Sequence, residues 1–247
     1  MSSPEFPFRI FEVGGCVRDA MLGVPTKDVD FAVEAESFDA MRAWIQDQGF
    51  HIWQERPEFL TIRASVAKTH PLRERTKDAD FVLCRSDSEG SDGRRPDSVQ
   101  PASILADLER RDFTINAMAI DCETGVLLDP HGGQEDLARK VLRFVGDPQV
   151  RIQEDALRIL RALRFAHTKG FTLAGETARA VFSDEAIAML ATLPLERFVG
   201  EVEKVLQHDL RSGMEWVLGL PDGFQEILWA GDRVFLNHGL SMRPAAK

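Results

Sequence analysis

The sequence predicts an α+β chain in which a mixed β-sheet comes first and helices follow. Between residues 8 and 128, short β-rich segments alternate with helical segments and turns. After Pro148 the apolar residues recur with helical spacing as far as about residue 230. Because the pattern changes near Gly146-Asp147-Pro148, we expect two domains, residues 1–147 and 148–247.

Length and composition are those of a globular protein. The chain has 247 residues, more than the ~100–150 of one usual domain. It is 44% hydrophobic and 28% charged, which excludes a wholly disordered or collagen-like chain. No apolar run approaches the ~20 residues of a membrane span, and the N-terminus lacks the pattern of a secretory signal. The three cysteines have no C-x-x-C spacing, so we expect a reducing, cytoplasmic setting without a disulfide framework, structural zinc or membrane.

The charge is unevenly distributed. The chain has a formal net charge of −10, which argues against indiscriminate nucleic-acid binding. Residues 139–170, however, contain eight basic and three acidic side chains, a local charge of about +5. This segment can bind phosphates despite the acidic total.

The predicted elements follow one another as short strands and helices. Residues 8–13 and 29–33 are β-rich, and a short helix over 17–22 separates them. Ser37 caps a predicted helix over 38–48, which Gly49 ends. Further predicted segments are strands over 51–54, 60–64 and 80–84, a polar loop over 86–102, a hairpin from 117–122 to 125–128, and a helix over 150–167.

An acidic pair lies at the start of the second strand. Asp28 and Asp30 flank Val29, so both carboxylates are expected on one face while Val29 enters the core. Like charges this close repel one another unless a cation lies between them. Mg²⁺ prefers such carboxylates together with substrate phosphates. The pair therefore predicts a metal site on Asp28 and Asp30, with two solvated acids at a strand end as the alternative.

A glycine turn precedes this pair. Gly14 and Gly15 lie between a strand and a helix, where backbone N–H groups can approach an anion. Arg18 is one turn into the helix and can reach the same anion. The turn and the acids would form one site, with a triphosphate on the glycines and metal ions on the acids. The alternative is a tight turn that needs a positive φ.

Two other segments carry candidate residues. Asp80 begins a predicted strand and is either a third carboxylate of the metal site or a simple strand-start aspartate. In the segment 110–116, Arg111 can pair with a phosphate, Asp112 can accept from ribose hydroxyls, and Asn116 can fix the local backbone. A surface salt-bridge cluster with an Asx turn is the alternative for this segment.

The predicted helix 150–167 has an arginine stripe opposite an apolar face. Arg158, Arg161 and Arg164 recur every three residues, and Asp155 lies three residues before the first of them. Asp155 and Arg158 together offer an acceptor and a planar donor fork that can hydrogen-bond the edge of a base. An intrahelical ion-pair ladder is the alternative interpretation.

Five motifs in this order resemble those of one known family. They are VGGCVRD (13–19), LGVPTKDVDF (22–31), LERRDFTINAMA (108–119), DPHGG (129–133) and EDALRILRALRF (154–165). Together they resemble class II tRNA nucleotidyltransferases (CCA-adding enzymes) and the related bacterial poly(A) polymerases, within the DNA polymerase β-like nucleotidyltransferase superfamily. The resemblance implies a mixed-sheet nucleotidyltransferase head domain followed by an all-helical neck and shortened body domain.

The resemblance also implies roles for the matching residues. Gly14, Gly15, Arg18 and Arg111 would contact the triphosphate, Asp112 would read the ribose, and Asn116 would lie beside them. Asp28 and Asp30 would bind two Mg²⁺ ions, and Asp80 would be the supporting carboxylate. Asp155 and Arg158 would pair with the incoming base, with Arg161 and Arg164 near the nucleotide.

The implied reaction adds C and A residues to the 3′ end of tRNA from CTP and ATP and releases pyrophosphate. An RNA 3′-hydroxyl would attack the NTP α-phosphate in line, assisted by the two metal ions. A poly(A) polymerase, an enzyme that adds only CC or only A, and an inactive RNA-binding relic remain alternatives. Family members continue past this length, so we expect a reduced tRNA-binding surface, a second copy or helper subunit, or a truncated chain that stops at Lys247.

Overall fold

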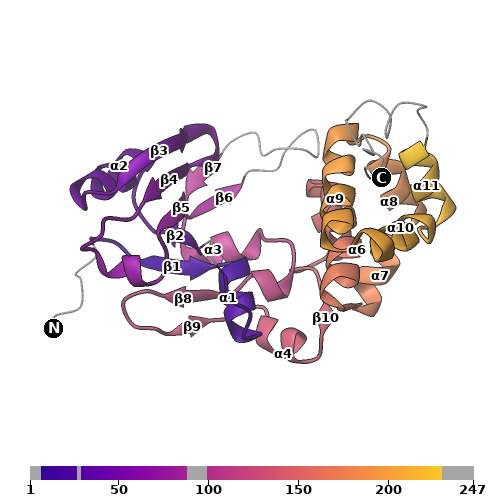
Figure 1. Ribbon diagram of the computed structural model, residues 1–247, viewed down its shortest axis with the longest axis horizontal. Helices are drawn as coiled ribbons and strands as arrows, with labels where there is room; N and C mark the ends of the chain where they lie inside the picture. Colours follow the sequence, from indigo (N-terminus) through magenta and orange to yellow (C-terminus); the bar gives the residue numbers. More distant parts are fainter. Residues whose placement is uncertain (1–6, 27–28, 88–98, 230–247) are drawn as a thin grey trace, which may run out of the picture. The chain divides into compact units, whose positions relative to one another are not determined.

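The computed structural model describes residues 7–26, 29–87 and 99–229. The chain divides into two compact units, Met1–Asp147 and Pro148–Lys247, which we call the head unit and the helical unit. Figure 1 shows the elements of each unit in chain order. In the described part of the chain, no helix combines the length and apolar character needed to span a membrane.

A seven-stranded mixed sheet forms the head unit, in the order β3-β4-β5-β2-β1-β8-β9. Strands β2 and β5 are parallel, and the neighbouring pairs on both sides are antiparallel. The strands are β1 (Ile10–Val13), β2 (Val29–Val33), β3 (His51–Arg56), β4 (Thr61–Ser65), β5 (Asp78–Leu83), β8 (Ala119–Asp121) and β9 (Leu127–Leu128). Strands β6 (Arg85–Asp87) and β7 (Val99–Pro101) form a separate hairpin.

Each face of the sheet is packed against apolar side chains. On one face Phe31 and Phe81 stack, and Trp44 of helix α2 (Phe38–Asp47) lies edge-on to Phe81. On the other face, Ile104 and Leu108 of helix α3 (Ile104–Glu109) join a buried cluster with sheet residues that include Phe11, Val13, Ala32 and Ala119. This second face carries the candidate site where its apolar cover ends.

Short elements complete the head unit. Helix α1 (Gly15–Met21) follows β1, and helix α4 (Gly133–Ala138) packs against the 3₁₀ turn η3 (Thr114–Asn116). The backbone carbonyl of Thr114 is so close to Gly133 that a Cβ atom there would lie 2.3 Å from its oxygen. The remaining elements are η1 (Pro57–Phe59), η2 (Pro71–Glu74) and β10 (Val141–Leu142).

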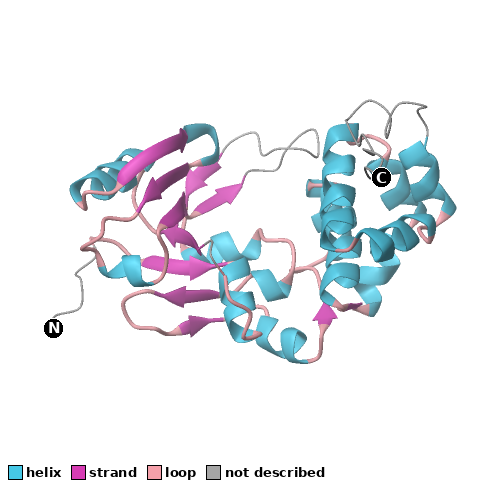
Figure 2. Ribbon diagram, viewed as in Figure 1, coloured by secondary structure: helices cyan, strands magenta, loops and turns pink. Residues whose placement is uncertain are grey.

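The helical unit consists almost entirely of short helices (Figure 2). Its buried side chains include Ile159 and Leu163 of α6 and Phe198 and Val202 of α9, and these two helices pack on each other. The elements are α5 (Pro148–Glu154), α6 (Leu157–Lys169), β11 (Thr172–Leu173), α7 (Gly175–Val181), α8 (Asp184–Leu190), α9 (Leu195–His208), α10 (Leu210–Leu218) and α11 (Asp222–Trp229).

The predicted fold class, a mixed-sheet head followed by helices, is confirmed. The Ser37 cap is confirmed as well, because its hydroxyl accepts from Ala40 N at 3.1 Å. The single helix over 150–167 is wrong: α5 ends at Glu154 and α6 begins at Leu157. The Asp155 carboxylate accepts from the backbone N–H of Leu157 at 3.0 Å, as a capping side chain does at a helix start, which explains the interruption.

Candidate functional site

Two carboxylates lie side by side at the centre of the head sheet. Asp30 on β2 and Asp80 on β5 are direct partners in the parallel register, so their side chains leave the same face of neighbouring strands. Asp30 is exposed and Asp80 is partly exposed, whereas Val29 beside Asp30 is buried. We call Asp30 and Asp80 the carboxylate pair. Asp28, the other predicted metal ligand, lies outside the described residues.

The glycine turn adjoins this pair. Val13, the last residue of β1, is the cross-strand partner of Asp30, and Gly14 follows it directly. Gly14 has φ 74° and ψ −128°, a conformation that essentially only glycine adopts. The turn thus brings the backbone of Gly14 and Gly15 close to Asp30, whereas Asp28 lies outside the described residues, and the anion-binding role of the turn stays a prediction.

Two arginines flank the glycine turn. A Cβ atom added to Gly14 would lie 3.0 Å from Nη1 of Arg111, and one added to Gly15 would lie 3.5 Å from Nη2 of Arg18. The absence of side chains at these glycines therefore lets two guanidinium groups approach the backbone of the turn. The result is a pair of guanidinium groups beside the turn, each of which also has an acidic partner, Asp19 for Arg18 and Asp107 for Arg111.

Asn116 and Asp112 form the support of Arg18. Arg18 is only 6% exposed; it donates through Nη1 to Oδ1 of Asn116 and through Nε to Asp19 at 2.9 Å. The Asn116 amide nitrogen donates in turn to Asp112 Oδ1 at 3.0 Å, and the same oxygen accepts from Phe113 N at 2.8 Å. Asn116 thus links Arg18 to Asp112 through its side chain, and its predicted role of fixing the local backbone stays a prediction. Asp112 is also buried and takes part in the same network.

Asp107 anchors the arginine pair Arg110 and Arg111. Its carboxylate is 1% exposed; Oδ1 accepts from Nε and Nη2 of Arg110 at 3.0 and 2.6 Å. Oδ2 accepts from Nη2 of Arg111 at 2.9 Å. Burial raises the pKa of Asp107, but the charges and hydrogen bonds of the two arginines outweigh it and leave this pKa below its usual value. Asp107 is therefore an ionised counter-charge inside the protein.

The donor set suits a hard divalent cation. Adjacent carboxylates with open coordination positions are the ligands that Mg²⁺ uses when substrate phosphates complete its shell. The Asp80 carboxylate already has a cationic partner, because Arg63 Nε on β4 donates to it at 3.0 Å. Within residues 7–26, 29–87 and 99–229, no three His, Cys, Asp or Glu side chains gather as a metal cluster, and Asp28 lies outside these ranges.

The predicted base-reading residues lie in the helical unit. Asp155 accepts from Leu157 N through Oδ1 and from Arg197 Nη2 on α9 through Oδ2, each at 3.0 Å. Arg158 follows in the first turn of α6, and its Nη1 donates to Glu154 at 2.6 Å. Asp155 and Arg158 thus remain neighbours despite the helix break, although both already have protein partners.

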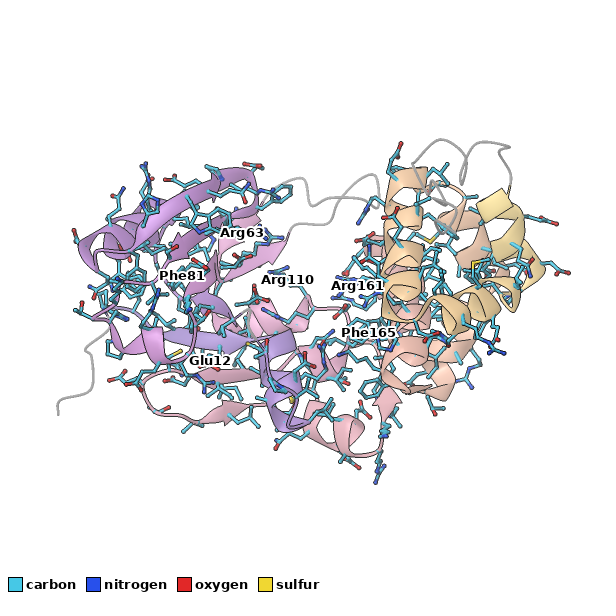
Figure 3. All side chains as sticks on the ribbon, viewed as in Figure 1. Glu12, Arg63, Phe81, Arg110, Arg161 and Phe165 are labelled. Atoms are coloured by element: carbon cyan, nitrogen blue, oxygen red, sulfur yellow. The ribbon has the colours of Figure 1, made fainter. Side chains whose placement is uncertain are left out.

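The other two arginines of the stripe have different surroundings. The guanidinium carbon of Arg161 is 5.8 Å from the ring centre of Phe165 (Figure 3). Arg164 Nε donates to Glu201 on α9 at 2.5 Å, and the Glu201 side chain is 3% exposed. Burial raises the pKa of Glu201, yet its bonds and charge contacts with Lys204 and Arg164 leave this pKa below the ordinary value. Arg164 therefore joins α6 to α9.

Sequence reasoning missed three side chains that position the predicted ones: Asp107, Arg63 and Arg197. Asp107 precedes Arg110 and Arg111 by three and four residues, a helical spacing that could have indicated ion pairs. Arg63 and Arg197 reach their aspartates from other elements, 17 and 42 residues away, so no local pattern revealed them.

Comparisons with known proteins agree with the motifs. Residues 10–143 match the model of the poly(A) polymerase head domain. The CCA-adding enzyme of Geobacillus thermodenitrificans is 38% identical over 200 residues, which are 81% of this chain and 46% of that protein. The A-adding tRNA nucleotidyltransferase of Aquifex aeolicus is 36% identical over 204 residues, 81% of this chain and 23% of that protein.

A solved structure of a tRNA nucleotidyltransferase with a primer tRNA and an incoming ATP analogue has a similar fold. The comparison of that structure with this chain gives a TM-score of 0.64 at 33% sequence identity, and it covers 90% of this chain and 56% of that one. The chain spans about half the length of the Geobacillus CCA-adding enzymes that it matches. The head-domain match nevertheless includes both members of the carboxylate pair, the glycine turn and Arg111. The chain therefore belongs to the family of nucleotidyltransferases that share the poly(A) polymerase head domain, with CCA-adding enzymes among its relatives.

Proposed function

We propose that this protein is a template-independent RNA nucleotidyltransferase that adds C and A residues to the 3′ end of tRNA from CTP and ATP. One observation carries the proposal: the carboxylate pair lies in register beside a glycine turn that two arginines flank. This arrangement would provide for two parts of a nucleotidyl transfer, which are phosphate binding and charge neutralisation.

Phosphate binding falls to the glycine turn and its arginines. Arg111 and Arg18 present guanidinium donors over Gly14 and Gly15, and such groups bind phosphate oxygens in bidentate fashion. Asp107 and Asn116 fix these two guanidinium groups before the substrate arrives. The leaving pyrophosphate would therefore be held on the β1 side of the carboxylate pair.

Asp30 and Asp80, together with Asp28, would bind Mg²⁺. The bound ions would supply an activated 3′-hydroxyl and neutralise the charge of the leaving phosphates. The protein's own contribution is placement: two strands of one sheet fix Asp30 and Asp80, and β1 places the glycine turn beside them. The segment that carries Asp28 precedes β2 directly.

Base selection belongs, in this proposal, to Asp155 and Arg158. A carboxylate acceptor and a guanidinium donor can accept C and A and reject U and G through their hydrogen-bond pattern. The bond from Arg197 to Asp155 supports this role, because it fixes one carboxylate oxygen while a lone pair on the other stays available. Residues 1–147 would be the catalytic head and residues 148–247 the neck and part of the body.

The acceptor and the product remain part of the proposal. Relatives of this chain include CCA-adding enzymes and an A-adding enzyme, so addition of only A is the alternative with a specific observation behind it. The match covers 46% of the CCA-adding relative from Geobacillus thermodenitrificans, so binding of a whole tRNA also belongs to the proposal.

One assay separates these products. The purified chain is incubated with Mg²⁺ and two tRNAs, one lacking its 3′ CCA and one ending in CC, with labelled CTP and ATP supplied separately and together. The proposal predicts three added residues on the first tRNA and one A on the second. A single A on the CC-ending tRNA alone would identify an A-adding enzyme, and a long A tract would identify a poly(A) polymerase. RNA binding without pyrophosphate release under all conditions would identify an inactive relic.

A further inference from the structure

A single cross-strand row passes through the carboxylate pair and continues to the edge of the sheet. Val13 pairs with Asp30, Asp30 with Asp80, Asp80 with Arg63, and Arg63 with Gln54 on the edge strand β3. Residues in direct register share a face, so this row lies on the same side of the sheet from the glycine turn to β3. The row has the glycine turn at its β1 end and an exposed aromatic ring at its β3 end, and the carboxylate pair lies between these ends.

The β3 end of the row bears an exposed aromatic ring and a cation. Trp53 lies at an irregularity of β3, between Ile52 and Gln54, and is 51% exposed. The head unit's other tryptophan, Trp44, is 6% exposed in the core. The guanidinium carbon of Arg63 lies 5.7 Å from the centre of the Trp53 ring, while its Nε donates to Asp80. Arg63 is labelled in Figure 3. We call Trp53 and Arg63 the edge platform.

Proteins that bind single-stranded nucleic acid combine exposed aromatic rings with basic side chains. Bases stack on the ring whatever their sequence, and the guanidinium contacts the backbone phosphates. An isolated structural role explains the pair less well, because half of the Trp53 surface remains in water and exposed ion pairs such as Arg63–Asp80 add little stability.

The order of the row indicates which reactant the platform faces. In an in-line displacement, the attacking group and the leaving group lie on opposite sides of the reacting phosphorus. The glycine turn with Arg18 and Arg111 takes the leaving phosphates on the β1 side of the carboxylate pair. The attacking strand then arrives from the opposite side, where β4 and β3 carry the edge platform.

The dimensions agree with this order. Adjacent strands are about 4.8 Å apart, so β4 and β3 lie on the order of 10 and 14 Å from β2. That distance suits the last few nucleotides of a single strand whose terminal hydroxyl reaches the carboxylates. The platform therefore lies within one short oligonucleotide of Asp30 along the same face.

We infer that Trp53 and Arg63 bind the single-stranded 3′ end of the acceptor RNA, with a base stacked on the indole and a phosphate on the guanidinium. This inference rests on the proposed function, since it identifies where that function's second substrate lies. It also gives Arg63 two partners in turn: it pairs with Asp80 when RNA is absent and contacts phosphate when RNA is bound.

The test measures RNA binding without catalysis. The probe is a fluorescently labelled tRNA acceptor minihelix ending in a single-stranded CC tail, compared with a blunt minihelix that lacks the tail. Dissociation constants are measured with the full chain in Mg²⁺ and without nucleotide, so that no transfer occurs. The variants are Trp53→Ala, Trp53→Phe, Arg63→Ala and Arg42→Ala.

Arg42 provides a matched control for Arg63. Its Nε pairs with Glu55 at 3.0 Å, and the side-chain exposures of 44% and 29% nearly equal the 41% and 29% of Arg63 and Asp80. Both arginines belong to surface ion pairs of the head unit, so both alanine variants should fold. Only Arg63 contacts the Trp53 ring and the carboxylate pair.

Trp53→Ala is expected to weaken binding of the tailed minihelix roughly 5- to 150-fold, the loss that corresponds to about 1–3 kcal/mol per stacked base. Trp53→Phe should retain part of the affinity that Trp53→Ala loses. Arg63→Ala should also weaken binding of the tailed minihelix, whereas Arg42→Ala should leave it unchanged. The blunt minihelix should be insensitive to Trp53. The KM for primer should rise in Trp53→Ala while the KM for ATP stays constant.

Binding of the tailed minihelix within twofold of wild type in Trp53→Ala would overturn the inference. So would a change in the ATP KM in place of the primer KM, because the ring would then contact the incoming nucleotide. A different result would refute the proposed function alone. If the wild-type protein never extends a primer, but Trp53→Ala still weakens binding of the tailed minihelix, the inference about the edge platform stands and the proposed transferase activity is refuted.

Discussion

Replacing Asp107 with asparagine tests how the head unit fixes Arg111 beside the glycine turn. The substitution keeps the shape of the side chain but removes the charge that pairs with both Arg110 and Arg111. An asparagine can still accept from one arginine, whereas its amide group would face the other guanidinium as a donor. Both arginines are largely buried, at 24% and 20% side-chain exposure, so water replaces the lost partner poorly.

The expected cost follows from the burial of this cluster. Removing one partner of a buried ion pair costs about 3–5 kcal/mol, because the remaining charge is left uncompensated. With a urea slope of about 2 kcal/mol per molar, the unfolding midpoint of the head unit should fall by roughly 1.5–2.5 M. Loss of the fixed Arg111 rotamer should also weaken ATP binding by about 0.5–1.5 kcal/mol, or roughly 2- to 12-fold.

Urea unfolding and ATP titration of the same preparations provide the assay. Glu12→Gln is the control, since Glu12 is a buried carboxylate that Arg75 holds through two hydrogen bonds on the opposite face of the sheet. The control should lose stability yet bind ATP normally. An Asp107→Asn protein that unfolds at the wild-type urea concentration, or that binds ATP as tightly as wild type, would refute this reasoning.

Three further predictions concern the turn, the base-reading residues and pH. Gly14→Ala should cost about 1–3 kcal/mol of stability, because a Cβ atom is unfavourable at φ 74° and would displace Arg111; unchanged ATP affinity would contradict this. Arg197→Ala should release Asp155 and let UTP and GTP be incorporated, measured as ratios of kcat/KM, and intact selectivity would refute the role. The pKa of Glu201 is lower in the folded protein than in the unfolded chain, where it is near 4.3. The Glu201 carboxylate therefore stabilises the fold at pH values above the unfolded pKa, and this stabilisation is lost as the pH falls through the folded pKa. Glu201→Gln should flatten this acid dependence, and unfolding curves that match wild type at low pH would count against it.

The sequence sufficed for the features that short-range patterns determine. Alternating and helical periodicities predicted the sheet and the helical follower, and the Ser37 cap and the Gly14 turn depend on residue types with strong local preferences. Asp30 and Asp80 are neighbours because β2 pairs in parallel with β5, and this long-range pairing is not determined by the local sequence. The sequence offered Asp80 as a candidate without a means of placing it.

The interruption between α5 and α6 escaped prediction for a physical reason. No glycine or proline marks it, and the residues around Asp155 keep helical periodicity. The side chain of Asp155 competes for a backbone N–H, as aspartate often does, and Arg197 from α9 secures it in that position. The long-range ion pairs that position a site are thus the part that periodicity and local motifs leave open.

Nucleotide transfer by an Asp30→Asn variant tests whether the carboxylate pair carries the chemistry. If the carboxylate pair carries the chemistry, the wild-type protein should release pyrophosphate from ATP in the presence of Mg²⁺ and a CC-ending tRNA. This release should fall by about 10²- to 10³-fold in the variant, as when a charge-stabilising group is removed from an active site. Urea unfolding should show that the variant stays folded, because Asp30 is exposed. Turnover near the wild-type rate in a folded Asp30→Asn protein would show that the carboxylate pair does not carry the chemistry.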